Sequence, residues 1–112
     1  MPAEPGTGQQ RQVSLLAEGR RWIGAELRAD GTLVIEGQDL DPPAGLGGGE
    51  YEWTITVRPG DVPTVVRALG GQSGDDVLDL LSRHRDEVVG TGELTWLHGI
   101  GLHPDFWSRI GD

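Results

Sequence analysis

The sequence predicts an α+β domain: an antiparallel four-stranded meander followed by two or three short helices packed on one face of the sheet. Apolar and polar residues alternate through the first half of the chain, and the apolar spacing lengthens to that of a helix in the second half. Strands that precede helices, rather than alternating with them, are typical of α+β domains. A chain of 112 residues fits one domain, which we expect over residues 12–112, after a disordered tail over residues 1–11.

Four segments have the alternation of a strand. Asp30-Gly31, between the second and third of them, favours the positive φ of a type I′ hairpin turn. In the fourth and most regular segment, the residues expected to face the core are Tyr51, Trp53, Ile55 and Val57. We therefore expect strands over residues 12–18, 23–28, 32–36 and 50–58.

The helices are expected after residue 60. Asp61 is expected to cap the first helix, Ser73 the second, with Asp76 completing a capping box, and Thr91 a third, short helix. Apolar residues at helical spacing give the first two helices their buried stripes, which are Val62, Val65, Val66 and Leu69, then Val77, Leu80, Leu81 and Val88.

The composition excludes several classes of chemistry. Without cysteine, the chain has no disulfide, no thiolate metal site and no cysteine nucleophile. Every basic residue is arginine, which excludes the lysine of a P-loop and that of a Schiff base. The formal charge of −9 disfavours binding to nucleic acid, whose phosphates such a surface repels. The charge is explained by solubility or by a basic protein partner.

The expected location is the cytoplasm. No run of apolar residues is long enough to span a membrane. Residues 1–6 lack the basic start and the apolar core of a signal peptide. The absence of cysteine agrees with a reducing compartment.

No group of residues predicts a reaction or a cofactor. Asp75, Asp76 and Asp79 match the DDxxD spacing with which isoprenoid synthases hold magnesium. The chain is too short to enclose the cavity of such an enzyme, and aspartates in a first helical turn are explained by the helix dipole. No serine lies in a G-x-S-x-G turn, and His84 is expected to be partly buried on the apolar side of its helix. We predict no catalytic residue, no metal site and no cofactor, and regard an enzyme as the less favoured class.

Aromatic residues without an obvious place in the core are the candidates for a partner-binding surface. Trp22 lies on the strand face opposite the core, and Trp96 lies off the apolar stripe of its helix. Residues 104–107 are expected to form a last helical turn, and this aromatic tail should dock on the fold itself or else on a partner. Since tryptophan and arginine dominate interface hot spots, the predicted partner-binding residues are Trp22, Trp96, Trp107 and Arg109.

Three segments carry a resemblance to a known group of proteins: Glu36-Gly37-Gln38-Asp39-Leu40, Glu50-Tyr51-Glu52-Trp53 and the terminal Phe106-Trp107-Ser108-Arg109-Ile110-Gly111-Asp112. The chain resembles small proteins of high-GC Gram-positive bacteria that end in a similar Phe-Trp-Ser-Arg-(Ile/Val)-Gly-Asp tail. The resemblance implies a bacterial, cytoplasmic, single-domain protein. That group has no established activity, so no functional residue is carried over from it.

Three functional hypotheses follow. The favoured one is a small acidic protein-binding module, immunity-like or regulatory, such as an antitoxin-like inhibitor that covers a basic nuclease cleft. The alternative is a small-molecule or metal-binding domain, possibly an enzyme, with a pocket between sheet and helices and polar groups from Asp39, Asp41, His98 and His103. The third is a homodimer formed through the open edge of the first strand.

Overall fold

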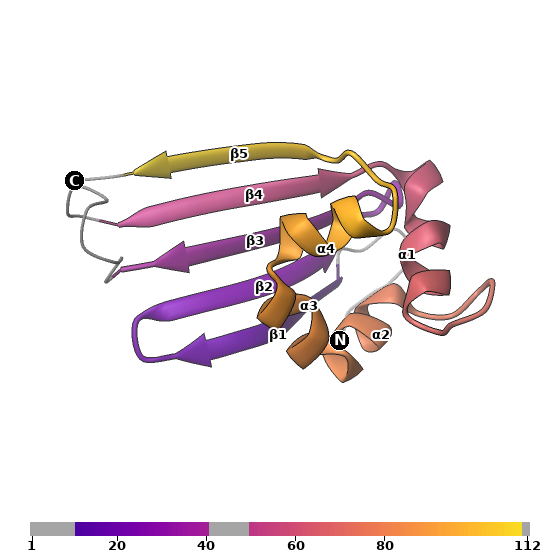
Figure 1. Cartoon of the computed structure of the whole chain (residues 1–112), viewed down its shortest axis with the longest axis horizontal. Coiled ribbons are helices and arrows are strands. Elements are labelled where there is room, and N and C mark those ends of the chain that lie inside the picture. The colour runs from indigo at the N-terminus through magenta and orange to yellow at the C-terminus, as the bar shows by residue number, and fades with distance from the viewer. Residues whose placement is uncertain (1–10, 41–49, 111–112) are drawn as a thin grey trace, which may run out of the picture.

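The computed structural model describes residues 11–40 and 50–110, and within them it has five strands, four α-helices and a short 3-10 helix. In chain order the elements are β1 (Arg11–Glu18), β2 (Arg21–Leu27), β3 (Leu33–Asp39), β4 (Tyr51–Val57), η1 (Pro59–Asp61), α1 (Val62–Ala68), α2 (Val77–Arg83), α3 (Arg85–Thr91), α4 (Glu93–Gly99) and β5 (Asp105–Ile110) (Figure 1). The strands form one antiparallel sheet in the order β1-β2-β3-β4-β5. The predicted α+β class is confirmed, with five strands instead of four.

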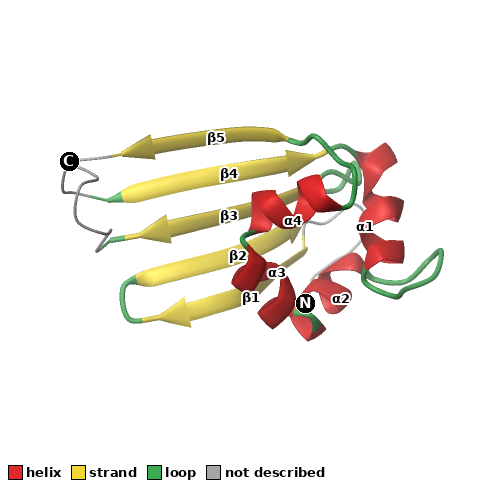
Figure 2. Cartoon of the chain, in the orientation of Figure 1, coloured by secondary structure: helices red, strands yellow, loops and turns green. Residues whose placement is uncertain are grey.

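The helices lie on one face of the sheet and gather over one end of it (Figure 2). The other end, which carries the turn between β1 and β2 and the end of β5, extends beyond them (Figure 1). All four α-helices have seven residues. In the described part of the chain, no helix has the length and apolar character needed to cross a membrane.

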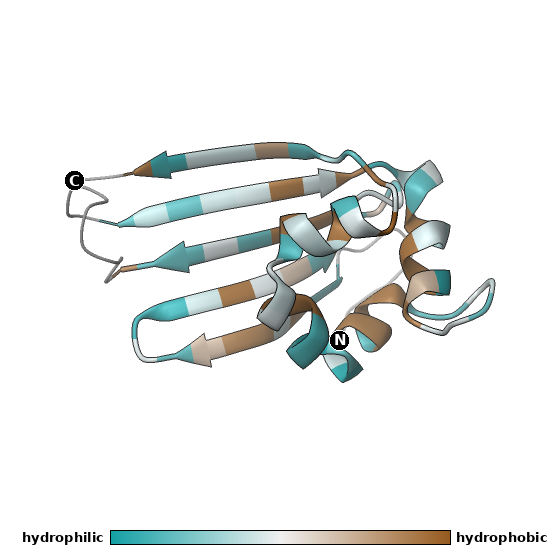
Figure 3. Ribbon diagram, viewed as in Figure 1, coloured by the Kyte–Doolittle hydropathy of each residue, from teal (hydrophilic) through white to brown (hydrophobic). Residues whose placement is uncertain are grey.

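The core lies between the helices and the inner face of the sheet, which we define as the face that carries Ala25, Ile35 and Ile55. These three residues are cross-strand partners, and each is fully buried. Apolar side chains of α1 to α4 pack against them, and Figure 3 shows the corresponding apolar bands on strands and helices. Each buried aliphatic side chain stabilises the fold by about 1.5–3 kcal/mol. Ile55 and Val57 are buried and Trp53 packs against the core, as the alternation of this strand predicted.

The hairpin between β2 and β3 forms where Asp30-Gly31 predicted it, but its turn is not of type I′. Only Gly31 has a positive φ, of 93°. The amide of Gly31 donates to the carbonyl of Arg28, and the amide of Arg28 donates to the carbonyl of Thr32. The carboxylate of Asp30 accepts from the amide of Thr32 at 2.9 Å. This is the pattern of a longer hairpin loop in which a tight turn is followed by one left-handed glycine.

The second predicted helix is divided into α2 and α3 at His84. His84 is the C-cap of α2 and the N-cap of α3, with φ −110° and ψ 23°, and its side chain is exposed. The expectation that His84 is partly buried is therefore wrong, because the break turns it away from the apolar stripe. Ser73 is not the N-cap of α2; Asp76 is, and its carboxylate accepts from the amide of Leu78 at 3.1 Å.

The end of the chain is a strand and not the helical turn that the sequence predicted. Residues Asp105–Ile110 form β5, which pairs with β4 from Thr56↔Asp105 to Tyr51↔Ile110. The physical reason is that the free edge of β4 offers unpaired backbone groups, and β5 satisfies them with aromatic and β-branched residues that suit a strand. The tail docks on its own fold through its backbone. Arg11, which was predicted to belong to a disordered tail, is instead the first residue of β1. Residues 1–10, the rest of that predicted tail, lie outside the described residues.

Candidate functional site

The outer face of the sheet, which points away from the helices, is organised in cross-strand rows. Alternation along each strand places these residues opposite the core residues. One row runs through Trp22, Gln38, Glu52 and Arg109, and the next runs through Gly24, Glu36, Thr54 and Trp107. Three of the four predicted partner-binding residues, Trp22, Trp107 and Arg109, thus lie on the same face in adjacent rows.

A hollow of about 230 Å³ lies between the two tryptophans on this face. We call it the outer hollow, and the residues that line it are Trp22, Glu36, Gly37, Gln38, Glu52, Trp53, Thr54 and Trp107. Trp107 is 51% exposed although it belongs to a paired strand. The outer hollow therefore presents aromatic surface at two of its sides and carboxylates between them.

Trp22 is held against its own strand by a glycine. A Cβ built on Gly24 would stand 2.3 Å from Cζ2 of Trp22. The indole therefore lies across the backbone at Gly24, on the outer face of the sheet, and occupies the space that a larger residue would fill. A ring fixed in this way loses little conformational entropy when a partner covers it.

The charge of the outer face is mainly negative. Among the described residues of β2 to β5 that point outward, the carboxylates are those of Glu26, Glu36, Glu52 and Asp105. The guanidinium among the same outward-pointing described residues is that of Arg109, which pairs with Glu52 at 3.3 Å. An acidic surface around exposed indoles attracts cationic groups by both charge and cation–π interaction.

Trp96 is not part of this surface. It is 7% exposed and belongs to the core cluster. Its indole Nε1 donates to Oε2 of Glu87 at 3.0 Å, which satisfies the one polar group of the buried ring. The prediction that Trp96 is available to a partner is therefore wrong. Its side chain packs on the inner face because the buried stripe of α4 runs through Glu93, Trp96 and Leu97.

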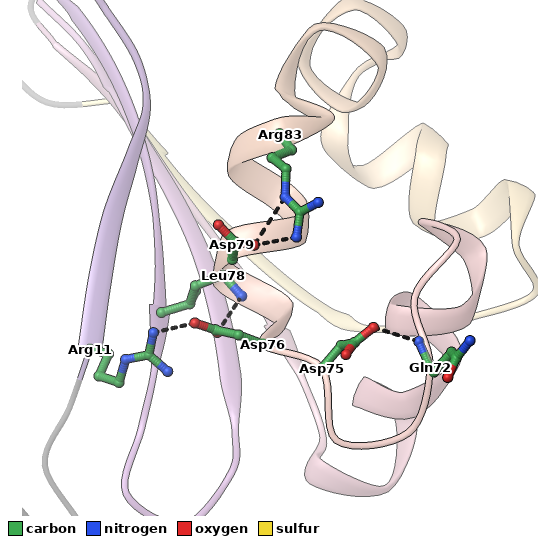
Figure 4. A network of polar contacts seen from close by, with 7 residues as sticks. All are labelled: Arg11, Gln72, Asp75, Asp76, Leu78, Asp79 and Arg83. Carbon is green, nitrogen blue, oxygen red and sulfur yellow. Dashed lines mark hydrogen bonds and ion pairs between the residues drawn. The ribbon is translucent and has the colours of Figure 1, made fainter.

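The three aspartates of the DDxxD spacing each have a partner in the structure, and one of them, Asp76, caps α2 (Figure 4). Asp76 caps α2 and forms an ion pair with Arg11, which ties the start of β1 to the start of α2. Asp75 accepts from the amide of Gln72 at 2.8 Å. Asp79 pairs with Arg83 one turn further along the helix. Since the carboxylates point to different partners, they do not converge on a shared ion.

Of the described residues predicted for a metal or small-molecule pocket, His98 and His103 lie together and Asp39 lies apart from them. The rings of His98 and His103 lie 5.7 Å apart with a tilt of 40°. Asp39 pairs with Tyr51 at the end of the sheet where β5 finishes, whereas His103 precedes the start of β5 at the opposite end. Asp41 lies outside the described residues. Within residues 11–40 and 50–110, no three His, Asp or Glu side chains are grouped so as to hold a metal ion.

A second hollow, which sequence reasoning missed, lies on the inner face between α4 and the last two strands. We call it the inner groove; its volume is about 230 Å³, and its lining includes Tyr51, Trp53, Ile55, Glu93, Leu94 and Phe106. Glu93 is 8% exposed, and its Oε2 has no hydrogen-bond partner among the residues that the structure describes. Burial raises the pKa of this carboxyl, and a hydrogen bond from its own amide and the charge of Arg21 oppose the rise. No sequence signal marks Glu93, because an acid in a first helical turn is ordinary.

Comparison with family models, with curated proteins and with solved structures found no match, so function is inferred below from the chain's own residues and their geometry.

Proposed function

We propose that the chain is a small acidic protein-binding module whose contact surface is the outer face of the sheet around the outer hollow. The observation that carries the proposal is that Trp22 and Trp107, far apart in sequence, line one hollow on the face opposite the core. Tryptophan at the centre of a surface patch is the residue type most enriched in interface hot spots. An exposed indole that serves no packing role in the core favours a binding role.

The charge of the same face supports a basic partner. The carboxylates of Glu26, Glu36, Glu52 and Asp105 surround the two indoles, and the formal charge of the chain is −9. Long-range attraction between such a surface and a basic protein raises the rate of association, and complementary charges fix the orientation of the complex. An arginine of the partner could stack on either indole while its guanidinium contacts a carboxylate.

Within this class, an immunity-like or regulatory protein of a bacterial cytoplasm is the role we favour. A compact acidic domain that covers a basic cleft on another protein blocks that cleft by charge and shape, without chemistry of its own. A nuclease is one kind of target with such a cleft, because it must bind phosphates.

Co-purification from the native host at low salt tests the proposal. The wild-type chain is expected to retain a basic protein, and Trp22→Ala with Trp107→Ala is expected to lose it. Arg67→Ala, an exposed position on α1, is the matched control and should retain the partner. A photo-reactive residue at position 107 should crosslink to the same protein. Retention of the same proteins by the double variant, or of none by the wild type, would contradict the proposal.

A homodimer through a sheet edge is the competing structural role. β1 and β5 are the two edges of the sheet, and an open edge can pair with a second copy. Sedimentation separates the two roles: a monomer at high protein concentration excludes the homodimer and leaves the outer face as the contact surface.

A further inference from the structure

The inner groove combines aromatic walls with a single buried acid. Tyr51, Trp53 and Phe106 line it from β4 and β5, and Glu93 and Leu94 line it from the start of α4. Phe106 is 47% exposed there, so the groove is open to ligands at its β5 side. The groove is on the inner face of the sheet and the outer hollow is on the other face, with Trp53 bordering both. The inference does not rest on the function proposed for the outer hollow.

Glu93 has no structural role that explains its burial. Its side chain caps no helix and forms none of the ion pairs of the described residues. A buried carboxylate oxygen without a hydrogen bond destabilises the fold, because it has lost its contacts with water and gained no other partner. Arg21 is exposed to solvent, and its charge lowers the pKa of Glu93 without forming one of the ion pairs of the described residues. The position therefore carries an uncompensated acceptor beside a groove that a ligand can enter.

We infer that the inner groove is a binding site for an organic cation, an ammonium or guanidinium group attached to a short carbon chain. The cation would donate a charge-assisted hydrogen bond to Glu93, while its carbon chain and its charge contact the aromatic walls. Such hydrogen bonds are about twice as strong as neutral ones. Aromatic rings around a desolvated cation add a further attraction through their electron-rich faces.

Other ligand classes fit the groove less well. An anion would meet the carboxylate of Glu93. A metal ion needs several oxygen ligands, and the described lining supplies only one carboxylate. A purely apolar ligand would bury the carboxyl further without giving it a partner. An organic cation satisfies both the acid and the apolar walls.

The raised pKa of Glu93 agrees with this ligand class. Burial favours the protonated carboxyl in the free protein. A cation beside the carboxyl favours the ionised form. Binding is therefore expected to release a proton, and it should strengthen as the pH rises.

The test uses two probes of the same shape, n-butylguanidinium and the uncharged n-butylurea. Each is titrated into the isotopically labelled full chain, and the backbone amides of residues 93–95 and 106 and the indole of Trp53 are followed by NMR. The guanidinium is expected to give saturable shifts at these positions, with affinity about tenfold or more above that of the urea. Glu93→Gln, which keeps the size of the side chain, should reduce the guanidinium to the affinity of the urea. Arg67→Ala, an exposed position on α1 that does not line the groove, is the control and should bind as the wild type does.

The source of the cation is decided by a second pair of probes, the capped tripeptides Gly-Arg-Gly and Gly-citrulline-Gly. Stronger binding of the arginine peptide than of the free guanidinium supports the site as a receptor for a basic side chain of another protein. Stronger or equal binding of the free guanidinium supports a small-molecule ligand. Absence of saturable shifts with both cations, or equal shifts with the uncharged probes, overturns the inference. Neither result bears on the proposed function, which is tested separately by whether the Trp22 and Trp107 variants lose the protein partner.

Discussion

The indole of Trp53 on β4 lies over Gly37 on β3, its direct cross-strand partner, so that a Cβ built on this glycine would stand 2.4 Å from Cε2 of the ring. Gly24 has the same relationship with Trp22 of its own strand, on the outer face of the sheet. Two glycines in neighbouring strands thus make room for one indole on each face. A glycine inside a strand usually weakens it, and here the ring that covers the glycine offsets that loss.

Gly37→Ala is expected to destabilise the fold by about 1–3 kcal/mol, as overpacking of a core does. The new methyl group would overlap the ring of Trp53, and that ring packs against the buried cluster. Urea unfolding measures the free energy. The control is Gly60→Ala, because nothing lies within 4 Å of a Cβ there, and it should change stability by less than about 0.5 kcal/mol. Equal stability of the two variants would contradict the packing argument.

Gly24→Ala is expected to act on the outer hollow more than on stability. The methyl group would displace the ring of Trp22, and this ring is only partly buried and can turn towards solvent. We expect a loss of stability smaller than that of Gly37→Ala, together with a changed environment of the Trp22 indole and weakened binding of the partner. The indole N–H resonance in an NMR spectrum, assigned with Trp22→Phe, reports the displacement. An unchanged resonance would show that the ring does not rest on Gly24.

Much of the sheet could be predicted from the sequence, because β4 alternates strictly and β2 and β3 each place apolar residues two apart on one face. β5 could not, because Phe106 and Trp107 are consecutive apolar residues that fit neither period, and because its partner β4 is distant in sequence. The prediction that Trp96 is available to a partner was wrong for a local reason. The buried stripe of α4 runs through Glu93, Trp96 and Leu97, and a stripe that begins with an acid does not read as apolar. For the same reason, the sequence did not indicate that Glu93 lines the inner groove.

Asp76 is expected to be the most important of the three aspartates near the start of α2. Asp76→Ala removes the cap on the amide of Leu78 and the ion pair with Arg11, at a cost of about 1 kcal/mol in stability. Asp76→Asn should cost less, because asparagine caps a helix as well as aspartate does and only the exposed ion pair is lost. Thermal unfolding of both variants, with Asp79→Asn as a control on the same helix, measures the difference. If Asp76→Asn were as unstable as Asp76→Ala, the ion pair and not the cap would be the main term.

Substitution of Trp96 is expected to reduce stability, and substitution of Trp107 is expected to reduce partner binding with little effect on stability. Trp96→Ala empties part of the core and breaks the hydrogen bond to Glu87, so we expect a loss of about 3–5 kcal/mol. Trp107→Ala removes a half-exposed side chain from an edge strand and should cost less than about 1 kcal/mol. Only the second variant should keep the fold and lose the partner. Urea unfolding and co-purification of the two variants in parallel check both statements, and a folded Trp107→Ala variant that keeps the partner would exclude this residue from the contact.

Glu93 should make the stability of the protein fall as the pH rises. Burial raises the pKa of this carboxyl above 4.5, its usual value, so the folded protein holds the proton more tightly than the unfolded chain does. Between the unfolded and the folded pKa, unfolding therefore releases a proton, and the contribution of Glu93 is lost as the pH rises through that interval. Glu93→Gln cannot ionise, so its stability relative to the wild type should rise as the pH increases above 4.5, the usual value for this carboxyl. The pKa values of Asp30 and Asp76 are lowered by hydrogen bonds from Thr32 and Arg11 respectively. Their contributions to stability are lost on acidification, but equally in both proteins, so they cancel in the comparison. The measurement is urea unfolding of both proteins across this range, and a difference that stays constant with pH would show that the carboxyl of Glu93 is not held in its protonated form by burial.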